Sequence, residues 1–294
     1  MSDLKAYLKN QQVLVDDALN KFLPRVTARP RTIHQGMRYS VFAGGKRLRP
    51  ILTLAAAEAC GGAQTKALAP ACAVEVMHTY SLVHDDLPSM DDDDLRRGRP
   101  TSHKVYGEGM AVLIGDALLT ESFTILARTE PTKRYSLRDL ILEFSCCGGS
   151  KKLIGGQVLD LEGEGKELTK AQLIRIHENK TAALLTTSLR LGGMTANATP
   201  RQLEALTNFG YNLGLAFQVV DDILDVTQST EKLGKTAGKD EAVDKATYPA
   251  ILGLEKSKKE ARRLTNKALN SLSPLGKKGA RLEDIAHYLL DREF

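Results

Sequence analysis

Apolar residues recur at intervals of three and four along most of the chain, and this spacing predicts a protein built from α-helices. The segment 4–23 keeps the pattern until Pro24, and the segment 68–87 is apolar enough to predict a long buried helix that ends near Pro88. No stretch shows the apolar–polar alternation of a β-strand, and no low-complexity linker or fixed-period repeat divides the 294 residues. We therefore expect a single all-α domain over residues 1–294.

The other expected helices are bounded by turn residues such as Gly192-Gly193 and Thr199-Pro200. They cover 32–42, a mostly apolar stretch that follows Pro50 and ends at Gly61, and then 108–128, 136–150, 151–162, 170–192, 200–227, 247–272 and 282–291. Aromatic residues make up only 5% of the chain, and Trp is absent. This composition favours helices packed through small and aliphatic side chains, because sheets are enriched in aromatic and β-branched residues.

The bulk properties narrow the classes of function. A net charge of +5 is too small to indicate nucleic-acid binding, and the basic stretch 256–263 has the spacing of a solvated helix face. The four cysteines form no CxxC pair and no His cluster accompanies them, so we expect no zinc site. The N-terminus lacks a signal-peptide pattern, and no apolar run approaches the ~20 residues that span a bilayer. We expect a soluble, cytoplasmic protein without stable membrane insertion.

Two aspartate clusters stand at the ends of apolar helices. The first is Asp85-Asp86-Leu87-Pro88-Ser89-Met90-Asp91, and the second is Asp221-Asp222-Ile223-Leu224-Asp225. Crowded carboxylates repel one another unless a cation neutralises them, and oxygen ligands without His or Cys nearby fit Mg²⁺. An acidic surface loop paired with the arginines that follow is the alternative interpretation of the first cluster. Two such clusters together indicate a metal-dependent site.

Basic residues that suit phosphate binding accompany the clusters. They are Lys46 and Arg49 in the motif GGKRLRP, the Arg96-Arg97 pair, Lys180 beside Thr181, and Lys235 after Gly234. No GxxxxGK[ST] motif occurs, which disfavours a nucleoside triphosphate. His78 lies two helical turns before Asp85, about 20° off the same face, so it is either a ligand contact or an ordinary core histidine.

Several motifs, taken in order, are similar to those of the trans-prenyltransferases, and most closely to those of the bacterial farnesyl diphosphate synthases. They are GGKRLRP, HDDLPSMDDDDLRRGRPT, GQVLDLEG, HENKTAAL, GLAFQVVDDILDV, KLGKTAGKD and KATYPAILG, which together with His78 lie within roughly residues 30–292. The resemblance implies an all-α fold of about ten helices around a deep central cavity, usually in a homodimer.

The resemblance also implies a role for each matching residue. Asp85, Asp86 and Asp91 would hold Mg²⁺ against an allylic diphosphate, and Asp221 and Asp225 would hold another ion from the opposite wall, with about three ions in all. Arg96, Lys180 and Lys235 would bind the same diphosphate. Lys46, Arg49, His78 and Arg97 would bind isopentenyl diphosphate. Thr181 and Gln218 would line the reacting carbons, and Gln157 and Asp160 would support the cavity.

These roles imply a reaction. The cations allow the allylic C–O bond to ionise, the isopentenyl double bond attacks the carbocation, and the released diphosphate removes a proton. A non-catalytic prenyltransferase-like subunit is an alternative, but it should have lost a cluster or the basic set. A diphosphate hydrolase is another, but no water-activating base is apparent in the sequence.

Product length is expected to depend on the residues that precede Asp85 on the same helix. Tyr80 comes five residues before Asp85 and so lies about 7.5 Å further into the core by helical rise, with Ser81 and Met77 beside it. In the family that the chain resembles, an aromatic residue here, together with the extra pair Pro88-Ser89, accompanies C15 products. We therefore expect farnesyl diphosphate, with geranylgeranyl or geranyl diphosphate as the nearest alternative and Tyr80 as plain core as the competing interpretation. The family's chain end is often basic and closes the isopentenyl site, whereas here only Arg292 could serve.

Overall fold

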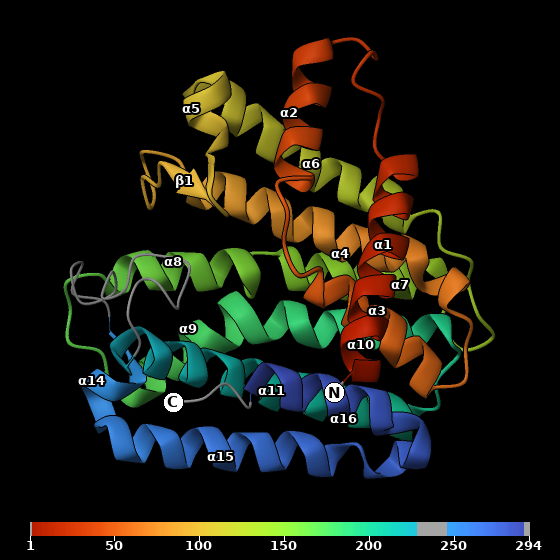
Figure 1. Ribbon diagram of the computed structural model, residues 1–294, viewed down its shortest axis with the longest axis vertical. Helices are drawn as coiled ribbons and strands as arrows, with labels where there is room; N and C mark the ends of the chain where they lie inside the picture. Colours follow the sequence, from red (N-terminus) through yellow and green to blue (C-terminus); the bar gives the residue numbers. More distant parts are fainter. Residues whose placement is uncertain (1, 228–245, 291–294) are drawn as a thin grey trace.

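The computed structural model describes residues 2–227 and 246–290, and helices make up most of this part (Figure 1). In chain order they are α1 (Ser2–Phe22), α2 (Arg31–Val41), α3 (Leu48–Ala59), α4 (Gln64–Asp85), α5 (Ser102–Tyr106), α6 (Glu108–Leu126), α7 (Leu137–Gly148), α8 (Leu153–Gly163), α9 (Lys170–His177), the π-helical turn η1 (Glu178–Ala182), α10 (Ala183–Thr195), α11 (Pro200–Thr227), α14 (Tyr248–Leu252), α15 (Leu254–Ser271), the 3₁₀ segment η2 (Ser273–Gly279) and α16 (Ala280–Leu290). The all-α expectation is confirmed. Lys235 and the chain end 291–294 lie outside the described residues.

Long helices lie side by side through the centre of the molecule. α4 packs against α6 and α10, α10 packs against α11, and α11 packs against α15. α4 is apolar on nearly every side because α3, α6 and α10 surround it. α10 approaches α3 so closely that a Cβ at Gly192 would lie 2.1 Å from the carbonyl oxygen of Thr53. α4 and α11 finish at the same end of the bundle, on the left of Figure 1, so the packing brings both aspartate clusters to that end.

The short hairpin after α4 departs from the sequence expectation, which had no strands. β1 (Leu95–Arg96) pairs antiparallel with β2 (Arg99–Pro100). Positive φ angles of 56° at Arg97 and 74° at Gly98 produce the tight turn between them. Strands of two residues are too short to show alternation, so periodicity could not predict them. The hairpin holds Arg96 and Arg97 over the end of α4.

Two helices that the sequence predicts as continuous are interrupted. The expected helix 170–192 contains η1, which carries Lys180 and Thr181. The expected helix 247–272 breaks at Gly253, whose φ of 79° ends α14 and starts α15. Both interruptions occur within a sequence that keeps its helical period, so the period alone does not reveal them.

α6 corrects a further expectation. By length and composition, it is the one helix in the described part of the chain that could cross a membrane, with a mean hydropathy of 1.5 over its best window. The sequence expectation had found no run of that length. In the fold, α6 packs against α4, α2 and α5, and 39% of the window is buried. Val112 and Leu113 point outward and are 40% and 54% exposed.

Candidate active site

A cavity of about 270 Å³ lies beside the C-terminal half of α4. Its lining combines side chains from α3, α4, α8 and η1, together with the loop after α4. The lining residues are Arg49, His78, Tyr80, Ser81, Leu82, His84, Asp85, Met90, Leu153, Ile154, Gln157, Lys180 and Thr181. The fold thus gathers in one place eight residues that the sequence selected from four separate motifs and from the helix before Asp85, namely Arg49, His78, Tyr80, Ser81, Asp85, Gln157, Lys180 and Thr181.

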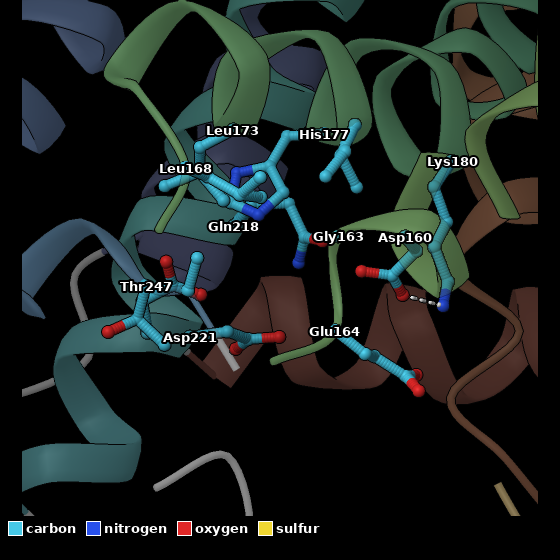
Figure 2. A pocket seen from close by; sticks show the side chains of 13 residues that line it. Asp160, Gly163, Glu164, Leu168, Leu173, His177, Lys180, Gln218, Asp221 and Thr247 are labelled. Carbon is cyan, nitrogen blue, oxygen red and sulfur yellow. Dashed lines mark hydrogen bonds and ion pairs between the residues drawn. The ribbon is translucent and has the colours of Figure 1, made fainter. Parts of the chain in front are cut away.

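A second cavity, of about 190 Å³, lies between α8, α9 and the end of α11 (Figure 2). It is lined by Asp160, Gly163, Glu164, Leu168, Leu173, Ile176, His177, Lys180, Gln218, Asp221, Asp222, Ala246 and Thr247. Lys180 belongs to the walls of both cavities. The first cavity contains Asp85 and the second contains Asp221, so Lys180 lies between the two aspartate clusters.

The π-helical turn η1 explains how Lys180 reaches this position. A π turn adds one residue to a helix and so reorients the side chains within it. Lys180 Nζ lies 2.6 Å from Asp160 Oδ2, and the Thr181 hydroxyl donates a hydrogen bond of 2.8 Å to Gln218 Oε1. Figure 2 shows the Lys180–Asp160 pair at one side of the second cavity.

Glycines allow the neighbouring helices to approach η1. A Cβ at Gly156 of α8 would lie 2.4 Å from the backbone nitrogen of Lys180. A Cβ at Gly214 of α11 would lie 2.5 Å from the Cα of Ala182. Any larger residue on either side would push the turn away, so the position of Lys180 depends on glycine in both helices.

The first aspartate cluster carries more negative charge than its surroundings favour. Burial raises the pKa of Asp85 to about 6, and the charges of Asp91 and Asp86 add to the rise while those of Lys180 and Arg96 oppose it. The backbone nitrogen of Asp91 donates to the carbonyl oxygen of Asp85 at 2.9 Å, which keeps the exposed Asp91 near it. Asp85 is therefore a carboxyl group that a nearby cation would stabilise in its charged form.

Asp86, directly after the last residue of α4, pairs with Arg96 of the hairpin. Asp86 is 3% exposed and accepts a hydrogen bond of 2.9 Å from Arg96 Nε. Burial raises the pKa of Asp86, and the bond to Arg96 lowers it. Arg96 also donates to Asp93 at 3.1 Å. Part of the acidic run is thus paired with an arginine of the hairpin, as the surface-loop interpretation of the sequence anticipated.

The aspartates of the second cluster occupy different positions relative to the second cavity. Asp221 is partly buried and lines the second cavity, as does Asp222. Asp222 Oδ2 accepts a hydrogen bond of 2.9 Å from the backbone nitrogen of Tyr248, the first residue of α14. Asp225 is 6% exposed and is not among the lining residues of either cavity. Its expected role as a ligand remains a prediction.

The basic residues expected near isopentenyl diphosphate gather around the turn 44–49. Arg97 donates from the hairpin to the carbonyl oxygen of Gly44. Lys46 is exposed, while Arg49 is partly buried and lines the first cavity with His78. Burial and then the positive charges of Arg49 and Arg97 lower the pKa of His78 far below its usual value, so His78 is neutral at pH 7.

The aspartate carboxylates of the two clusters suit a Mg²⁺ ion that is bound jointly by the protein and by the substrate phosphates. Within residues 2–227 and 246–290, no group of three His, Cys, Asp or Glu side chains could hold a metal ion by itself. Mg²⁺ commonly binds through one or two carboxylates and completes its octahedron with water and substrate phosphates. Asp85, with its raised pKa and its acidic neighbours, is a donor of this kind. Asp221 is a second oxygen donor, across the position of Lys180.

Tyr80 forms part of the wall of the first cavity. Its side chain is 5% exposed, and its ring stands edge-on to the His84 ring, with the centroids 5.7 Å apart. Ser81 lines the cavity too, and its hydroxyl donates to the carbonyl oxygen of His78 at 2.9 Å. Met77 is fully buried and is not among the residues that line this cavity.

Four lining residues with polar side chains had not been singled out from the sequence. They are His84 in the first cavity and Glu164, His177 and Thr247 in the second. His84 stands directly before Asp85, which was a usable signal. The His177 ring stacks on the Tyr248 ring, with the centroids 5.6 Å apart, and no spacing in the sequence indicates this contact between distant segments.

Comparison with known proteins agrees with this geometry. The family model described as polyprenyl synthetase matches residues 30–283. A chloroplastic geranylgeranyl pyrophosphate synthase of Capsicum annuum is 46% identical over 99% of this chain and 79% of the relative. A solved structure of a putative farnesyl-diphosphate synthase from Marinomonas sp. MED121 is 38% identical, with a TM-score of 0.85 over 98% of this chain and 99% of the other. A geranylgeranyl pyrophosphate synthetase structure from Pyrococcus horikoshii Ot3 is 30% identical, with a TM-score of 0.90 over 99% of both chains. The chain has the isoprenoid synthase fold and belongs to the polyprenyl synthetase family.

Proposed function

We propose that the chain is a prenyltransferase that joins isopentenyl diphosphate to an allylic diphosphate. The observation that carries the proposal is the position of Lys180 in the wall of a cavity with Asp85 and of a second cavity with Asp221. A cation flanked by two acidic walls suits a diphosphate that binds through both Mg²⁺ and direct hydrogen bonds. Membership of the polyprenyl synthetase family supports the same chemistry.

In this proposal Asp85, Asp86 and Asp91 hold Mg²⁺ on one side of the allylic diphosphate, and Asp221, with Asp225, holds it on the other. About three ions would supply charge neutralisation for the leaving diphosphate. Lys180 donates to the oxygens on which negative charge develops as the C–O bond breaks, and Arg96 and Lys235 bind the same group. These roles follow from the resemblance, and substitution of each residue tests them.

The organic part of the substrates would occupy the first cavity. Leu82, Leu153 and Ile154 provide apolar walls that exclude water from a carbocation. Thr181 and Gln218, which are hydrogen-bonded to each other, would line the reacting carbons. Lys46, Arg49 and Arg97, with neutral His78, would hold the diphosphate of isopentenyl diphosphate, and the released diphosphate would take the proton.

We propose farnesyl diphosphate, C15, as the main product because the buried ring of Tyr80 stands in the cavity wall below Asp85. A growing chain that passes Asp85 would meet this ring. One solved relative is titled a putative farnesyl-diphosphate synthase, and another, from Zymomonas mobilis, is titled an FPP/GFPP synthase at 32% identity.

Geranylgeranyl diphosphate, C20, is the second candidate. The names of the matched curated relatives favour it over C15, since the Capsicum annuum protein and a Cyanophora paradoxa protein of 42% identity are both named geranylgeranyl synthases. Replacement of Tyr80 by a smaller residue separates the two candidates, because only a C15 enzyme limited by this ring should lengthen its product.

We also propose a homodimer that buries the outer face of α6. Val112 and Leu113 are exposed apolar neighbours on this long apolar helix, and a second copy of the chain would cover them. Leu113→Glu should shift the mass measured by multi-angle light scattering from dimer towards monomer. A monomeric wild type would contradict the dimer.

The test of the proposed activity is transfer of labelled isopentenyl units to dimethylallyl and geranyl diphosphate. We expect transfer with Mg²⁺ and none with a chelator. Release of diphosphate from the allylic substrate at the same rate without isopentenyl diphosphate would favour a hydrolase instead. Folded protein that neither elongates nor hydrolyses, but binds another synthase, would favour a non-catalytic subunit.

A further inference from the structure

Arg47 is buried in an unusual conformation next to the proposed isopentenyl diphosphate site. Its side chain is 2% exposed, and its φ of 50° lies in the left-handed region that favours glycine. It immediately precedes α3, and Arg49 lies two residues further on. A residue in this conformation persists only where its surroundings fix it firmly.

Three acceptors fix the Arg47 guanidinium. Nη1 donates to Glu75 Oε1 at 2.9 Å, Nε donates to Asp16 Oδ1 at 2.8 Å, and Nη2 donates to the carbonyl oxygen of Val41 at 2.7 Å. The Glu75 side chain is 3% exposed, whereas that of Asp16 is 37% exposed. The bond to Glu75 is therefore the fully buried ion pair of the set.

Glu75 also faces the other arginines of the site. Burial lowers the pKa of Arg49 and of Arg97, the negative charge of Glu75 opposes this shift, and repulsion from neighbouring arginines adds to it. Glu75 stands three residues before His78 on α4, and so on the same side of the helix. The single buried carboxylate of Glu75 thus bonds to Arg47 and interacts through its charge with Arg49 and Arg97 around the turn 44–49.

Arg49 has capacity left for a ligand. Burial lowers its pKa to about 10, and its Nε atom is buried without a hydrogen-bond partner among the described residues. Arg49 lines the first cavity. At the start of the turn, Arg97 donates to the carbonyl oxygen of Gly44. The turn is therefore held by Arg97 at Gly44 and by the buried contacts of its own Arg47.

We propose that Glu75 is a positioning residue for isopentenyl diphosphate, which holds Arg47 and through it the turn that presents Lys46 and Arg49 to the diphosphate. This inference rests on the proposed function of the site. Glu75 would not touch the substrate. It would set the position of the groups that do, and its charge would let three arginines stand close together before the anion arrives.

Glu75→Gln is the direct test, because the amide keeps the size and one acceptor oxygen but removes the charge. We expect KM for isopentenyl diphosphate to rise roughly tenfold, since a buried charged hydrogen bond is weakened. KM for geranyl diphosphate should change less than about twofold, because that substrate is proposed to bind at Asp85 and Lys180. An unchanged KM for isopentenyl diphosphate in folded Glu75→Gln would overturn the proposal.

Glu143→Gln is the matched control. Glu143 accepts two hydrogen bonds from Arg190, at 2.8 and 2.9 Å, and lines neither active-site cavity. It should lower the melting temperature without a selective change in either KM. If Glu143→Gln raised KM for isopentenyl diphosphate as much as Glu75→Gln, the effect would reflect general loosening, and the proposal would be wrong.

Arg47→Lys tests the same contact from the other side and decides the question if Glu75→Gln does not fold. Lysine keeps the charge, but its single nitrogen cannot replace the three guanidinium nitrogens that reach three separate acceptors. The same selective rise in KM is therefore expected, and its absence would contradict the proposal. Calorimetric binding of isopentenyl diphosphate is measured on wild type and variants in parallel. Absent turnover in wild type would then count against the proposed function, while the binding comparison still tests Glu75.

Discussion

Lys180 and Asp160 form an ion pair, with Nζ 2.6 Å from Oδ2, where the walls of the two cavities meet. Asp160 comes from α8 and Lys180 from the π-helical turn η1. The pair fixes a long, flexible side chain between the two aspartate clusters. In the proposed reaction a diphosphate oxygen would take over as the acceptor for Lys180.

Loss of the Lys180 ammonium should slow turnover more than it weakens binding, because its hydrogen bonds strengthen as charge develops on the leaving diphosphate. Lys180→Met is expected to lower kcat roughly 100-fold. Steady-state kinetics with geranyl and isopentenyl diphosphate measure this. Lys170→Met is the control, since Lys170 pairs with Glu260 at 3.4 Å and lines neither cavity. Equal losses in both variants would contradict the role of Lys180.

Asp85→Asn should raise the Mg²⁺ concentration needed for half-maximal activity and lower kcat by about 100-fold or more, because a metal ligand is lost. Asp94→Asn is the matched control in the same acidic run. Asp94 pairs with Lys104 at 2.7 Å on the surface, and its loss should change either value less than about twofold. A Mg²⁺ titration of both variants gives the answer. An unaltered Mg²⁺ requirement in Asp85→Asn would rule out the proposed metal site.

Removal of the Tyr80 ring should lengthen the product. Tyr80→Ala opens the cavity wall below Asp85, and the fraction of C20 and longer diphosphates should rise at the expense of C15. Chromatography of the dephosphorylated alcohols measures the distribution. Tyr211→Ala removes a ring that lies outside both cavities and should leave the product unchanged. Unchanged C15 output from Tyr80→Ala would make Tyr80 an ordinary core residue.

Gly156→Ala should disturb catalysis through the backbone. The added Cβ would lie 2.4 Å from the nitrogen of Lys180 and would push η1 away from α8. We expect a loss of about 1–3 kcal/mol in the free energy of unfolding, together with roughly tenfold lower kcat. Urea denaturation and kinetics measure the two effects. Gly109→Ala, where a Cβ meets nothing within 4 Å, is the control. Full activity in Gly156→Ala would show that η1 tolerates displacement.

The sequence predicts the helices and the two acidic walls because both depend on local pattern. Apolar residues at helical spacing predict α4 and α11, and the aspartates lie near the end of each helix. This local pattern does not depend on how the rest of the chain folds. The gathering of Arg49, His78, Asp85 and Lys180 around one cavity was expected only through resemblance to a family. No local pattern states that α3, α4 and η1 meet.

Other features depend on contacts that the sequence does not display. The helices α8 and α11 approach the π turn at Lys180 through Gly156 and Gly214, and a continuous helix would have the same apolar spacing as the interrupted one. The hairpin that carries Arg96 and Arg97 is too short for a strand pattern. In the sequence, Glu75 is a charged residue within an apolar helix and has no evident partner. The structure shows that it accepts a hydrogen bond from Arg47.

The most direct test of the central claim is incubation of the purified protein with Mg²⁺, geranyl diphosphate and isopentenyl diphosphate, followed by sizing of the product. We expect a C15 diphosphate as the main product. A main product of C20 would contradict the role given to Tyr80 and leave the prenyltransferase in place. No elongation by folded protein would contradict the proposed function itself.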